Sequence, residues 1–252
     1  MKIPSPDEIG TSVTPQCPTV MTVSGPHTRI NLLIKLPSRG RPDQLLDVVR
    51  AMNMAHGSSG YNIHWLFSID TDDKSMDGRE REIKVIPCGT CDVERGLSTS
   101  KIHAINRDIN ECAYPWDIIV VASDDMWPVQ EGWDTIIREA MQTHFPDTDG
   151  MLWFPDGHQK RISTMPIMGR KYYNRFRKVY HESYRSFFCD DEQTEIAQAH
   201  GKMVYIDRQL FDHRHPANSK SGKVDQTYLR ANADWNADKL NYQRRRLAGF
   251  PQ

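Results

Sequence analysis

The stretch Asp117–Trp127, DIIVVASDDMW, restricts the fold of this chain more than any other part of it. The residues at 118–122 are all β-branched or small and apolar, which predicts a strand buried on both faces of a parallel sheet. Ser123, Asp124 and Asp125 follow that strand. Open α/β sheets bind ligands beyond the carboxyl ends of their strands, and paired carboxylates there suit a divalent cation that also holds phosphate. The alternative is that both acids only begin a solvated turn.

The composition favours one large α/β domain. The 252 residues carry 32 Lys and Arg against 33 Asp and Glu, so no overall positive field would draw the chain to nucleic acid or to anionic membranes. Mean hydropathy is −0.65, and no apolar run approaches the roughly 20 residues that cross a bilayer. The amino terminus also lacks the apolar core of a signal peptide. We therefore expect a soluble, cytoplasmic protein without membrane insertion.

The five cysteines indicate a reducing compartment. An odd number of cysteines without a secretory signal predicts free thiols. Cys88 and Cys91 form a CGTC pair, but no second pair follows at zinc-finger spacing. We expect neither a redox nor a structural zinc role for this pair.

The first strand, helix and intervening loop provide basic residues. Residues 30–36, INLLIKL, read as a strand, and apolar residues from Leu45 to Met52 follow at helical spacing. The loop between them, PSRGRPDQ, places Ser38, Arg39 and Arg41 at the strand's carboxyl end. Guanidinium groups at this position suit a phosphate or a base edge. Alternatively, the arginines only solvate the loop.

A second strand also ends in acids. Residues 63–70, IHWLFSID, lead to Asp70, and two more acids lie in the following turn. Residues 83–86 predict a short third strand. A helix then places Ile102, Ile105 and Ile109 on one face, with Ser98 or Thr99 as the expected cap. Lys101 in its first turn would favour an anion, although it is equally plausible as a solvated lysine.

The second half continues the alternation of strands and helices. A helix is predicted around 133–141, a strand at 150–154, a short helix within 189–200 and a strand at 203–206. Three acids, including Asp190 and Asp191, come immediately ahead of the short helix, where acids are also common caps. His213 and His215 alternate, so in an extended segment both cannot face one ligand. This order predicts a mostly parallel, three-layer sheet.

Residues 158–188 differ in character from the rest. Basic side chains alternate with aromatic ones, a mixture that suits stacking on rings, bases or sugars beside phosphate. The alternative is a helix with an aromatic core face and a basic solvent face. The basic residues are Lys160, Arg161, Arg170, Lys171, Arg175, Arg177, Lys178 and Arg185, and the aromatic ones are Tyr172, Tyr173, Phe176, Tyr180, Tyr184, Phe187 and Phe188.

Taken together, the order of these motifs resembles the GT-A glycosyltransferases, most closely those of the family 2 type. From about Ile30 to His215 the chain has a strand leading to PSRGRP, a second ending in an acid, a central strand ending in SDD, a DDE beside a helix and a late HxH. The resemblance implies a Rossmann-like three-layer α/β/α sandwich. It implies a catalytic domain at 29–216 with a mobile flap at about 156–188. Residues 1–28 would form an extended arm, and 217–252 a charged tail packed on the body through Trp235 and Tyr242.

The resemblance also implies which residues hold the donor. Asp125 would coordinate Mn²⁺ or Mg²⁺ together with one of His213 and His215. Asp124 would contact the ribose or the donor sugar. Asp70 would hydrogen-bond the nucleobase, most often uracil in such enzymes, so a UDP-sugar is the expected donor. Pro37, Ser38, Arg39 and Arg41 would surround the nucleotide, and Lys101 would face its phosphates.

For the chemical step, the resemblance makes Asp191 the general base of an inverting reaction. Family members more often carry ED where this chain has DDE, so Asp190 is a rival for that role. The acceptor would be a saccharide or, as in some phage enzymes acting in a host cytoplasm, a hydroxylated base in DNA. Two other functions stay open. They are a nucleotidyltransferase, disfavoured by the single glycine in the first loop, and a non-catalytic nucleic-acid-binding module, disfavoured by the near-zero net charge.

Overall fold

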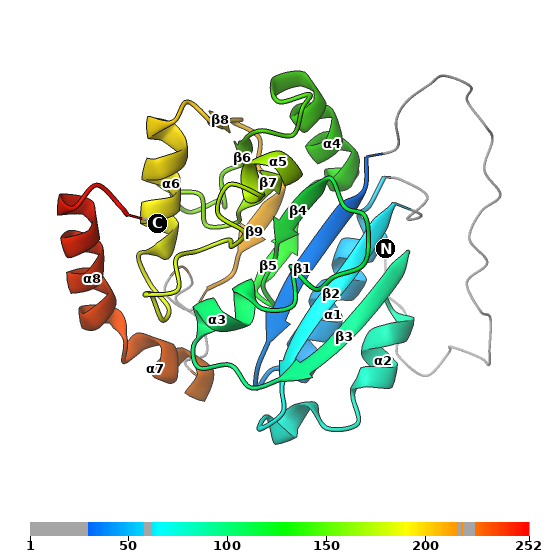
Figure 1. The fold of residues 1–252 in the computed structure, drawn as a ribbon. Helices are drawn as coiled ribbons and strands as arrows, with labels where there is room; N and C mark the ends of the chain where they lie inside the picture. Colours follow the sequence, from blue (N-terminus) through cyan, green and yellow to red (C-terminus); the bar gives the residue numbers. More distant parts are fainter. Residues whose placement is uncertain (1–29, 58–61, 216–217, 219–224, 252) are drawn as a thin grey trace, which may run out of the picture.

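A seven-stranded sheet forms the centre of the molecule (Figure 1). The computed structural model describes residues 30–57, 62–215, 218 and 225–251; the predicted arm at 1–28 lies outside this range. The strand order is β3-β2-β1-β4-β7-β6-β8. The strands are β1 (Leu32–Ser38), β2 (Ile63–Asp70), β3 (Thr90–Gly96), β4 (Ile118–Val121), β6 (Met151–Trp153), β7 (Ile167–Gly169) and β8 (Met203–Tyr205).

The sheet is mostly parallel, as predicted. β1 pairs in parallel with β2 and β4, β2 with β3, and β6 with β8. Only β7 runs antiparallel, against both β4 and β6. A second, two-stranded sheet joins β5 (Met126–Pro128) to β9 (Phe211–His213). This small sheet brings the segment after SDD beside the histidines, although more than 80 residues separate them.

Helices cover both faces of the central sheet. The first hydrophobic core lies under α1 (Pro42–Met54), α2 (Glu80–Val85) and α4 (Trp133–His144). The second lies under α3 (Lys101–Asn106), α5 (Arg170–Tyr173) and α6 (Cys189–Ala199). Alternation along β1 explains the two cores, because Leu32, Ile34 and Leu36 belong to the first and Leu33 to the second. The three-layer α/β/α arrangement is therefore confirmed.

The carboxyl-terminal segment forms two helices, α7 (Gln226–Asn232) and α8 (Trp235–Leu247), and α8 lies beside α6 (Figure 1). Tyr242 packs against the second core, and the Trp235 ring contacts Phe187 and Phe188 edge-on. Asp238, which is buried, accepts hydrogen bonds from the backbone N–H groups of residues 185–187. No helix in the described ranges is long and apolar enough to cross a bilayer.

Three sequence predictions about local structure are wrong. Residues 83–86 do not form a strand: Ile83 is the buried residue of helix α2, and the third strand begins later, at Thr90. The cap of α3 is Ser100, whose Oγ accepts from the His103 N–H, rather than Ser98 or Thr99. α3 also ends before Ile109, which is nevertheless buried in the second core.

Candidate active site

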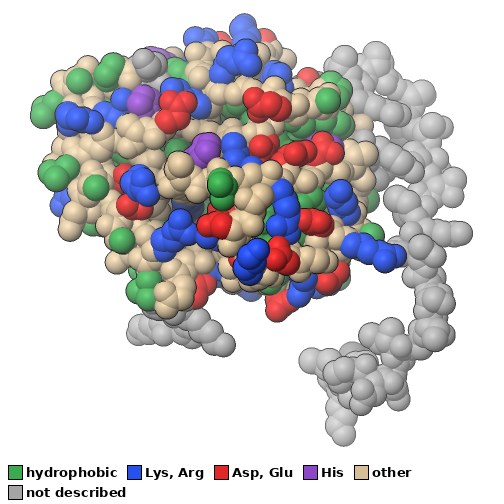
Figure 2. All heavy atoms as spheres, turned by 60° about the horizontal axis from the view of Figure 1, so that its bottom comes forward, with side chains coloured by type: hydrophobic (Ala, Val, Ile, Leu, Met, Phe, Trp, Pro, Cys, Tyr) green, Lys and Arg blue, Asp and Glu red, His purple; other side chains and the backbone are tan. Residues whose placement is uncertain are grey.

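A cavity of about 250 Å³ opens at the carboxyl ends of β1, β2 and β4, toward the bottom of Figure 1. Its wall brings together every residue predicted for the site except Asp191. These residues are Pro37, Ser38, Arg39, Arg41, Asp70, Lys101, Asp124, Asp125, Asp190, His213 and His215. The parallel strands β1, β2 and β4 explain this convergence, since their ends meet at one edge of the sheet. Figure 2 brings this side forward and shows acidic and basic side chains interspersed over it.

At one end of the cavity, Asp70 presents a buried acceptor. Its Oδ2 accepts from Arg39 Nη1 at 2.7 Å, whereas its Oδ1 is buried without a hydrogen-bond partner among the described residues. Arg39 also forms a two-pronged ion pair with Asp72, at 2.6 and 2.9 Å. An unsatisfied buried carboxylate oxygen is costly, so this feature of Asp70 requires an explanation.

Asp124 is held from the first loop. Its Oδ2 accepts from Ser38 Oγ at 2.8 Å, and its Oδ1 from Arg41 Nη1 at 3.1 Å. Burial raises the pKa of Asp124, although Arg41 and Ser38 oppose this shift. Arg41 also reaches Asp225, just before α7, with bonds of 2.6 and 2.9 Å. The guanidinium therefore joins the SDD motif to the carboxyl-terminal segment.

Asp125 faces His213. The distance from His213 Nε2 to Asp125 Oδ2 is 3.5 Å, and from His213 Nδ1 to Asp156 Oδ2 it is 3.7 Å, both longer than an ordinary hydrogen bond. Burial would lower the pKa of His213, but Asp125 and Asp156 raise it to about 9. Burial would likewise raise the pKa of Asp125, but His213 and the Ser123 hydroxyl bring it well below its usual range. The His213 ring, which carries a positive charge below this pKa, therefore lies between the two buried carboxylates of Asp125 and Asp156.

His215 has a different environment. Its ring lies 5.4 Å from that of His213 and 5.3 Å from that of Tyr228 on α7. Burial lowers the pKa of His215 to about 4, so this ring is neutral near pH 7. Both histidines line the cavity, but His213 is the one placed against Asp125.

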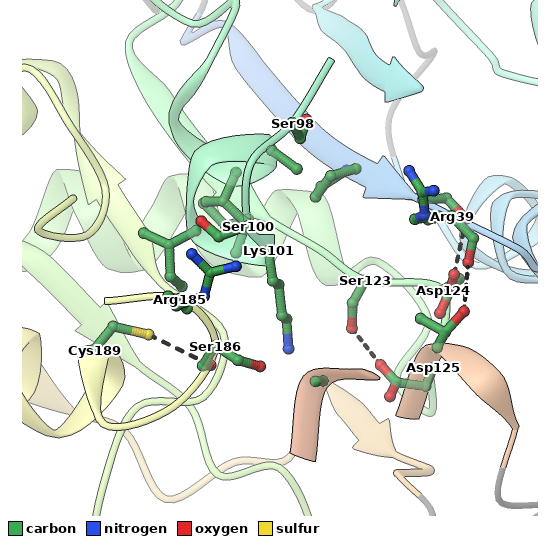
Figure 3. Close-up of a pocket in the computed structure, with 18 of the residues that line it drawn as sticks. Arg39, Ser98, Ser100, Lys101, Ser123, Asp124, Asp125, Arg185, Ser186 and Cys189 are labelled. Atoms are coloured by element: carbon green, nitrogen blue, oxygen red, sulfur yellow. Dashed lines mark hydrogen bonds between the residues drawn. The ribbon is translucent and has the colours of Figure 1, made fainter. Parts of the chain in front are cut away.

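Cations line the opposite wall. Lys101 extends from α3 into the space between Ser186 and Asp125 (Figure 3). Arg185 comes from the loop before α6; its Nε donates to Asp234 at 2.9 Å. Lys101 and Arg185 lie on the side of the cavity opposite Asp124 and Asp125 (Figure 3). An anionic group bound between the two sides would therefore meet positive charge on one of them.

The two aspartates at the start of α6 differ in direction. Asp190 lines the cavity, and burial together with the neighbouring Asp191 charge raises its pKa to about 6. Asp191 is buried outside the cavity lining and accepts a hydrogen bond from Arg161. Phe188, just before the helix, adopts a left-handed backbone with φ of 62°, which is unusual for a residue with a side chain. Consecutive side chains on an α-helix point about 100° apart, which explains why the two adjacent carboxylates have different surroundings.

Several residues of the site were missed by sequence reasoning. Asp156 lies three residues beyond strand β6, and Asp70 is the last residue of β2, so the same rule of acids near strand ends would have found it. Tyr228, Arg230 and Asp234, from α7 and the turn after it, gave no such signal, because helix α7 reaches the cavity only through tertiary packing. Gly40, with φ of 74°, permits this packing: a Cβ there would stand 2.8 Å from Thr227 Oγ1.

The basic and aromatic residues of 158–188 separate into two environments. The tyrosines at 172, 173, 180 and 184 are buried in the second core, as the alternative interpretation required. The helix of that interpretation is wrong, because α5 is the only helix within 158–188, a range that the structure describes in full. Many of the basic side chains form ion pairs within the chain; the pairs are Lys160–Asp207, Arg161–Asp191, Lys171–Asp147, Arg175–Asp149, Lys178–Glu182 and Arg185–Asp234. The mobility of this stretch stays a prediction.

Comparison with known proteins identifies the fold. No protein-family model matches the sequence, and no curated protein matches it either. Among solved structures, a mannosyltransferase from Pyrobaculum calidifontis in complex with GDP-Man and Mn²⁺ aligns with a TM-score of 0.60 at 12% identity, over 82% of this chain and 70% of that one. This chain has the GT-A fold.

A second GT-A structure aligns similarly. Residues 1–349 of S. aureus TarS in complex with UDP-GlcNAc give a TM-score of 0.57 at 9% identity, over 80% of this chain and 64% of that one. The chain therefore spans less than two thirds of the TarS fragment. At such low identity the likeness establishes the GT-A fold alone, and the activity must be argued from the cavity.

Proposed function

We propose that this protein is a metal-dependent glycosyltransferase that moves a sugar from a nucleoside diphosphate sugar to an acceptor hydroxyl. One observation carries the proposal. A single cavity at the carboxyl edge of the sheet is lined by Asp124, Asp125, Asp190 and Asp70, whose Oδ1 has no hydrogen-bond partner among the described residues. The two GT-A structures described above, which contain GDP-Man with Mn²⁺ and UDP-GlcNAc, support this proposal.

The residues around Asp125 fit a hard divalent cation. Asp125, His213 and Asp156 offer two carboxylates and an imidazole, all largely buried, and His213 Nδ1 has no hydrogen-bond partner among the described residues. We assign Asp125 and His213 as ligands of Mn²⁺ or Mg²⁺, a choice that the 3.5 Å separation supports over His215. Such an ion would offset the charge that develops on the leaving diphosphate.

The remaining side chains would bind and orient the donor. We assign Asp70 to the N–H edge of a nucleobase, which makes a uracil or guanine nucleotide the expected class, and we keep a UDP-sugar as the first choice. Asp124, fixed by Ser38 and Arg41, would accept from a hydroxyl of the ribose or sugar. Lys101 and Arg185 would face the phosphate oxygens, where a positive charge lowers the barrier to departure of the diphosphate.

For the chemical step we propose Asp190 as the general base in place of Asp191. Asp190 would accept the proton of the acceptor hydroxyl as its oxygen attacks the anomeric carbon and the bond to the diphosphate breaks, so the configuration would invert. Its position in the cavity wall and its pKa of about 6 support this role, since a base works best near the ambient pH. The contact between Asp191 and Arg161 supports a structural role for Asp191.

The rival functions find less support. A nucleotidyltransferase would call for a glycine-rich phosphate loop after β1, and Gly40 is the only glycine there. A nucleic-acid-binding surface requires basic side chains that are free to contact phosphate. Many of the basic side chains at 158–188 instead form ion pairs within the chain. A saccharide or other hydroxyl compound is therefore our proposed acceptor class, and a hydroxylated DNA base stays a prediction.

A donor screen tests the function. Release of nucleoside diphosphate is measured for a panel of nucleotide sugars with Mn²⁺, with Mg²⁺ and with EDTA. We expect metal-dependent release from one nucleotide class, including slow hydrolysis without acceptor. Asp125→Ala should abolish metal-dependent donor binding, and Asp207→Asn, which lies outside the cavity lining, should leave it unchanged. Pyrophosphate release would instead establish a nucleotidyltransferase, and metal-independent turnover would contradict the proposed site.

A further inference from the structure

A second cluster of metal-ligating side chains lies at the opposite end of the sheet. His64 on β2, Asp92 on β3 and Cys112 in the connection from α3 to β4 each offer one donor atom, and these three atoms all lie within 4.8 Å of one another. His64 is six residues before Asp70, and a strand rises about 3.3 Å per residue, so the cluster lies about 20 Å from the active-site cavity. It therefore belongs to neither the donor site nor its metal.

Strand register explains why the three donors meet. His64 and Asp92 point to the same face of the sheet, because His64 pairs with Thr90 and side chains alternate along β3. That face is the one covered by α3, after which the chain returns across it with Cys112 and Tyr114. The Tyr114 ring stacks on His64 at 4.7 Å between centroids. The imidazole is therefore fixed on one flat side by an aromatic ring.

Hydrogen bonds orient the imidazole for a ligand. His64 Nδ1 lies 2.8 Å from Thr90 Oγ1, and His64 Nε2 lies 3.1 Å from Asp92 Oδ2. When Nδ1–H donates to the Thr90 hydroxyl, the lone pair of Nε2 faces the Asp92 carboxylate. A cation held by the Nε2 lone pair and the Asp92 oxygen would give each of these two atoms a partner. Metal-binding histidines commonly have their second nitrogen held by such an oxygen.

The donor set indicates which metal would bind. We propose that His64, Asp92 and Cys112 form a zinc site with one open position for water. One nitrogen, one oxygen and one sulfur suit a borderline-soft cation, whereas Mn²⁺ and Mg²⁺ prefer oxygen. Ligand atoms around zinc stand roughly 3.5 Å apart, and His64 Nε2 and Asp92 Oδ2 are already 3.1 Å apart. Binding therefore requires mainly that the Cys112 sulfur approach this pair, by about 1 Å. The Asp92 side chain is 50% exposed, so it can turn toward the ion and leaves an entry path.

Such an ion would stabilise one edge of the molecule. Among the described residues, β3 is the terminal strand of the sheet, with β2 as its one neighbour. Zinc would tie β3 both to β2 and to the connection that carries Cys112. The Cys88 and Cys91 pair is not involved, since the Cys91 thiol donates to the Lys84 carbonyl oxygen on the other side of β3.

Cobalt substitution tests the site in the full chain. Co²⁺ is added to metal-free protein, and the sulfur-to-cobalt charge-transfer band in the near ultraviolet is recorded, followed by displacement with Zn²⁺. We expect one equivalent of thiolate-bound Co²⁺ in the unaltered protein. The band should be lost in Cys112→Ser and kept in Cys91→Ser, the matched control on the same edge. It should also persist in Asp125→Ala, because the active-site cation has no sulfur ligand.

Zinc affinity and stability provide the second measurement. Thr90→Val retains all three donors but removes the oxygen that orients His64, so zinc affinity should fall about 10- to 100-fold. Zinc should raise the melting temperature of the unaltered protein and of Cys91→Ser but not of Cys112→Ser or His64→Gln, each checked for folding by circular dichroism without metal. A band that survives Cys112→Ser, or equal zinc affinity in all these proteins, would overturn the proposal.

Discussion

Asp190 and Asp191 show how much the function of a carboxylate depends on its direction. The two residues are adjacent on α6, yet one lines the cavity and the other contacts Arg161. The family resemblance implies that Asp191 is the base, with Asp190 as its rival. The sequence does not separate the two, because which face of α6 meets the cavity and which meets Arg161 depends on tertiary packing. Asp70, by contrast, was predictable individually, since strand β2 ends at it.

Replacing Asp190 by Asn should lower the rate of transfer by about 10²- to 10⁴-fold, because an amide cannot accept the acceptor's proton. Donor affinity should change little. Asp191→Asn should have a much smaller effect on the rate. Steady-state transfer and calorimetric donor binding measure the two quantities, and the reverse order of the two variants would reinstate Asp191 as the base.

Transfer by the unaltered protein should depend on pH through Asp190. Its pKa of about 6 means that the carboxyl is protonated and inactive as a base below that value, so the rate should rise with pH through about 6 and then level off. The dependence of kcat on pH at saturating donor and acceptor measures this. A rate independent of pH on both sides of 6 would argue against a titrating base at this position.

Lys35 gives a pH dependence of stability. It is fully buried on β1, and Nζ donates to the Arg107 carbonyl at 2.8 Å. Burial lowers its pKa to about 7, despite the opposing charge of Asp108. Between about 7 and the unfolded value near 10.4, the unfolded chain binds more protons, so the free energy of unfolding should increase as pH rises through this window. Urea denaturation should show the increase, and Lys35→Met should flatten it; parallel pH profiles would contradict the assignment.

At the scale of elements, the sequence predicted long and strongly patterned segments better than short ones. β2 has the predicted limits, and α1 and α4 bury the predicted apolar residues. Residues 83–86 were misread because a short helix with one buried isoleucine and a short strand give the same apolar pattern. β5, β7 and β9 were missed because each has three residues, and their pairing depends on distant partners.

Helix α8 holds the loop that forms one wall of the cavity. Asp238 accepts from three backbone N–H groups at residues 185–187, with bonds of 2.8 to 3.0 Å. Asp238→Ala would leave these donors without their charged partner, so it should lower the free energy of unfolding by about 3 kcal/mol or more. Lys239→Ala, at an exposed position of the same helix, should change it by less than about 0.5 kcal/mol. Chemical denaturation measures both, and equal effects would show that the loop does not depend on Asp238.

At the scale of the whole molecule, the order of strands and acids predicted the architecture although no family model matches the sequence. Parallel strands require crossover connections, which are usually helices. The alternation of strand and helix patterns along the sequence therefore predicted the three-layer α/β/α arrangement. What could not be predicted is the contribution of distant segments. Asp225 binds Arg41 across 184 positions of sequence, and no local pattern marks such a pair.

A cation and a nucleotide bound in one cavity should stabilise the folded chain jointly. At a ligand concentration 100 times Kd, binding adds about 2.7 kcal/mol to the free energy of unfolding. UDP with Mn²⁺ should therefore raise the melting temperature by more than the sum of the two separate shifts, and EDTA should reverse the gain. Differential scanning fluorimetry measures this, with Asp125→Ala as the control that should lose the joint effect. Purely additive shifts would mean that ion and nucleotide bind independently.

The contribution of α7 to the cavity wall has a consequence for synthesis in the cell. Thr227, Tyr228 and Arg230 leave the ribosome after β1, β2 and β4, because α7 follows these strands in the chain. The strands β1, β2 and β4 can pair on a nascent polypeptide while the cavity still lacks the side that α7 provides. Full ligand affinity should therefore arise only after α7 has emerged.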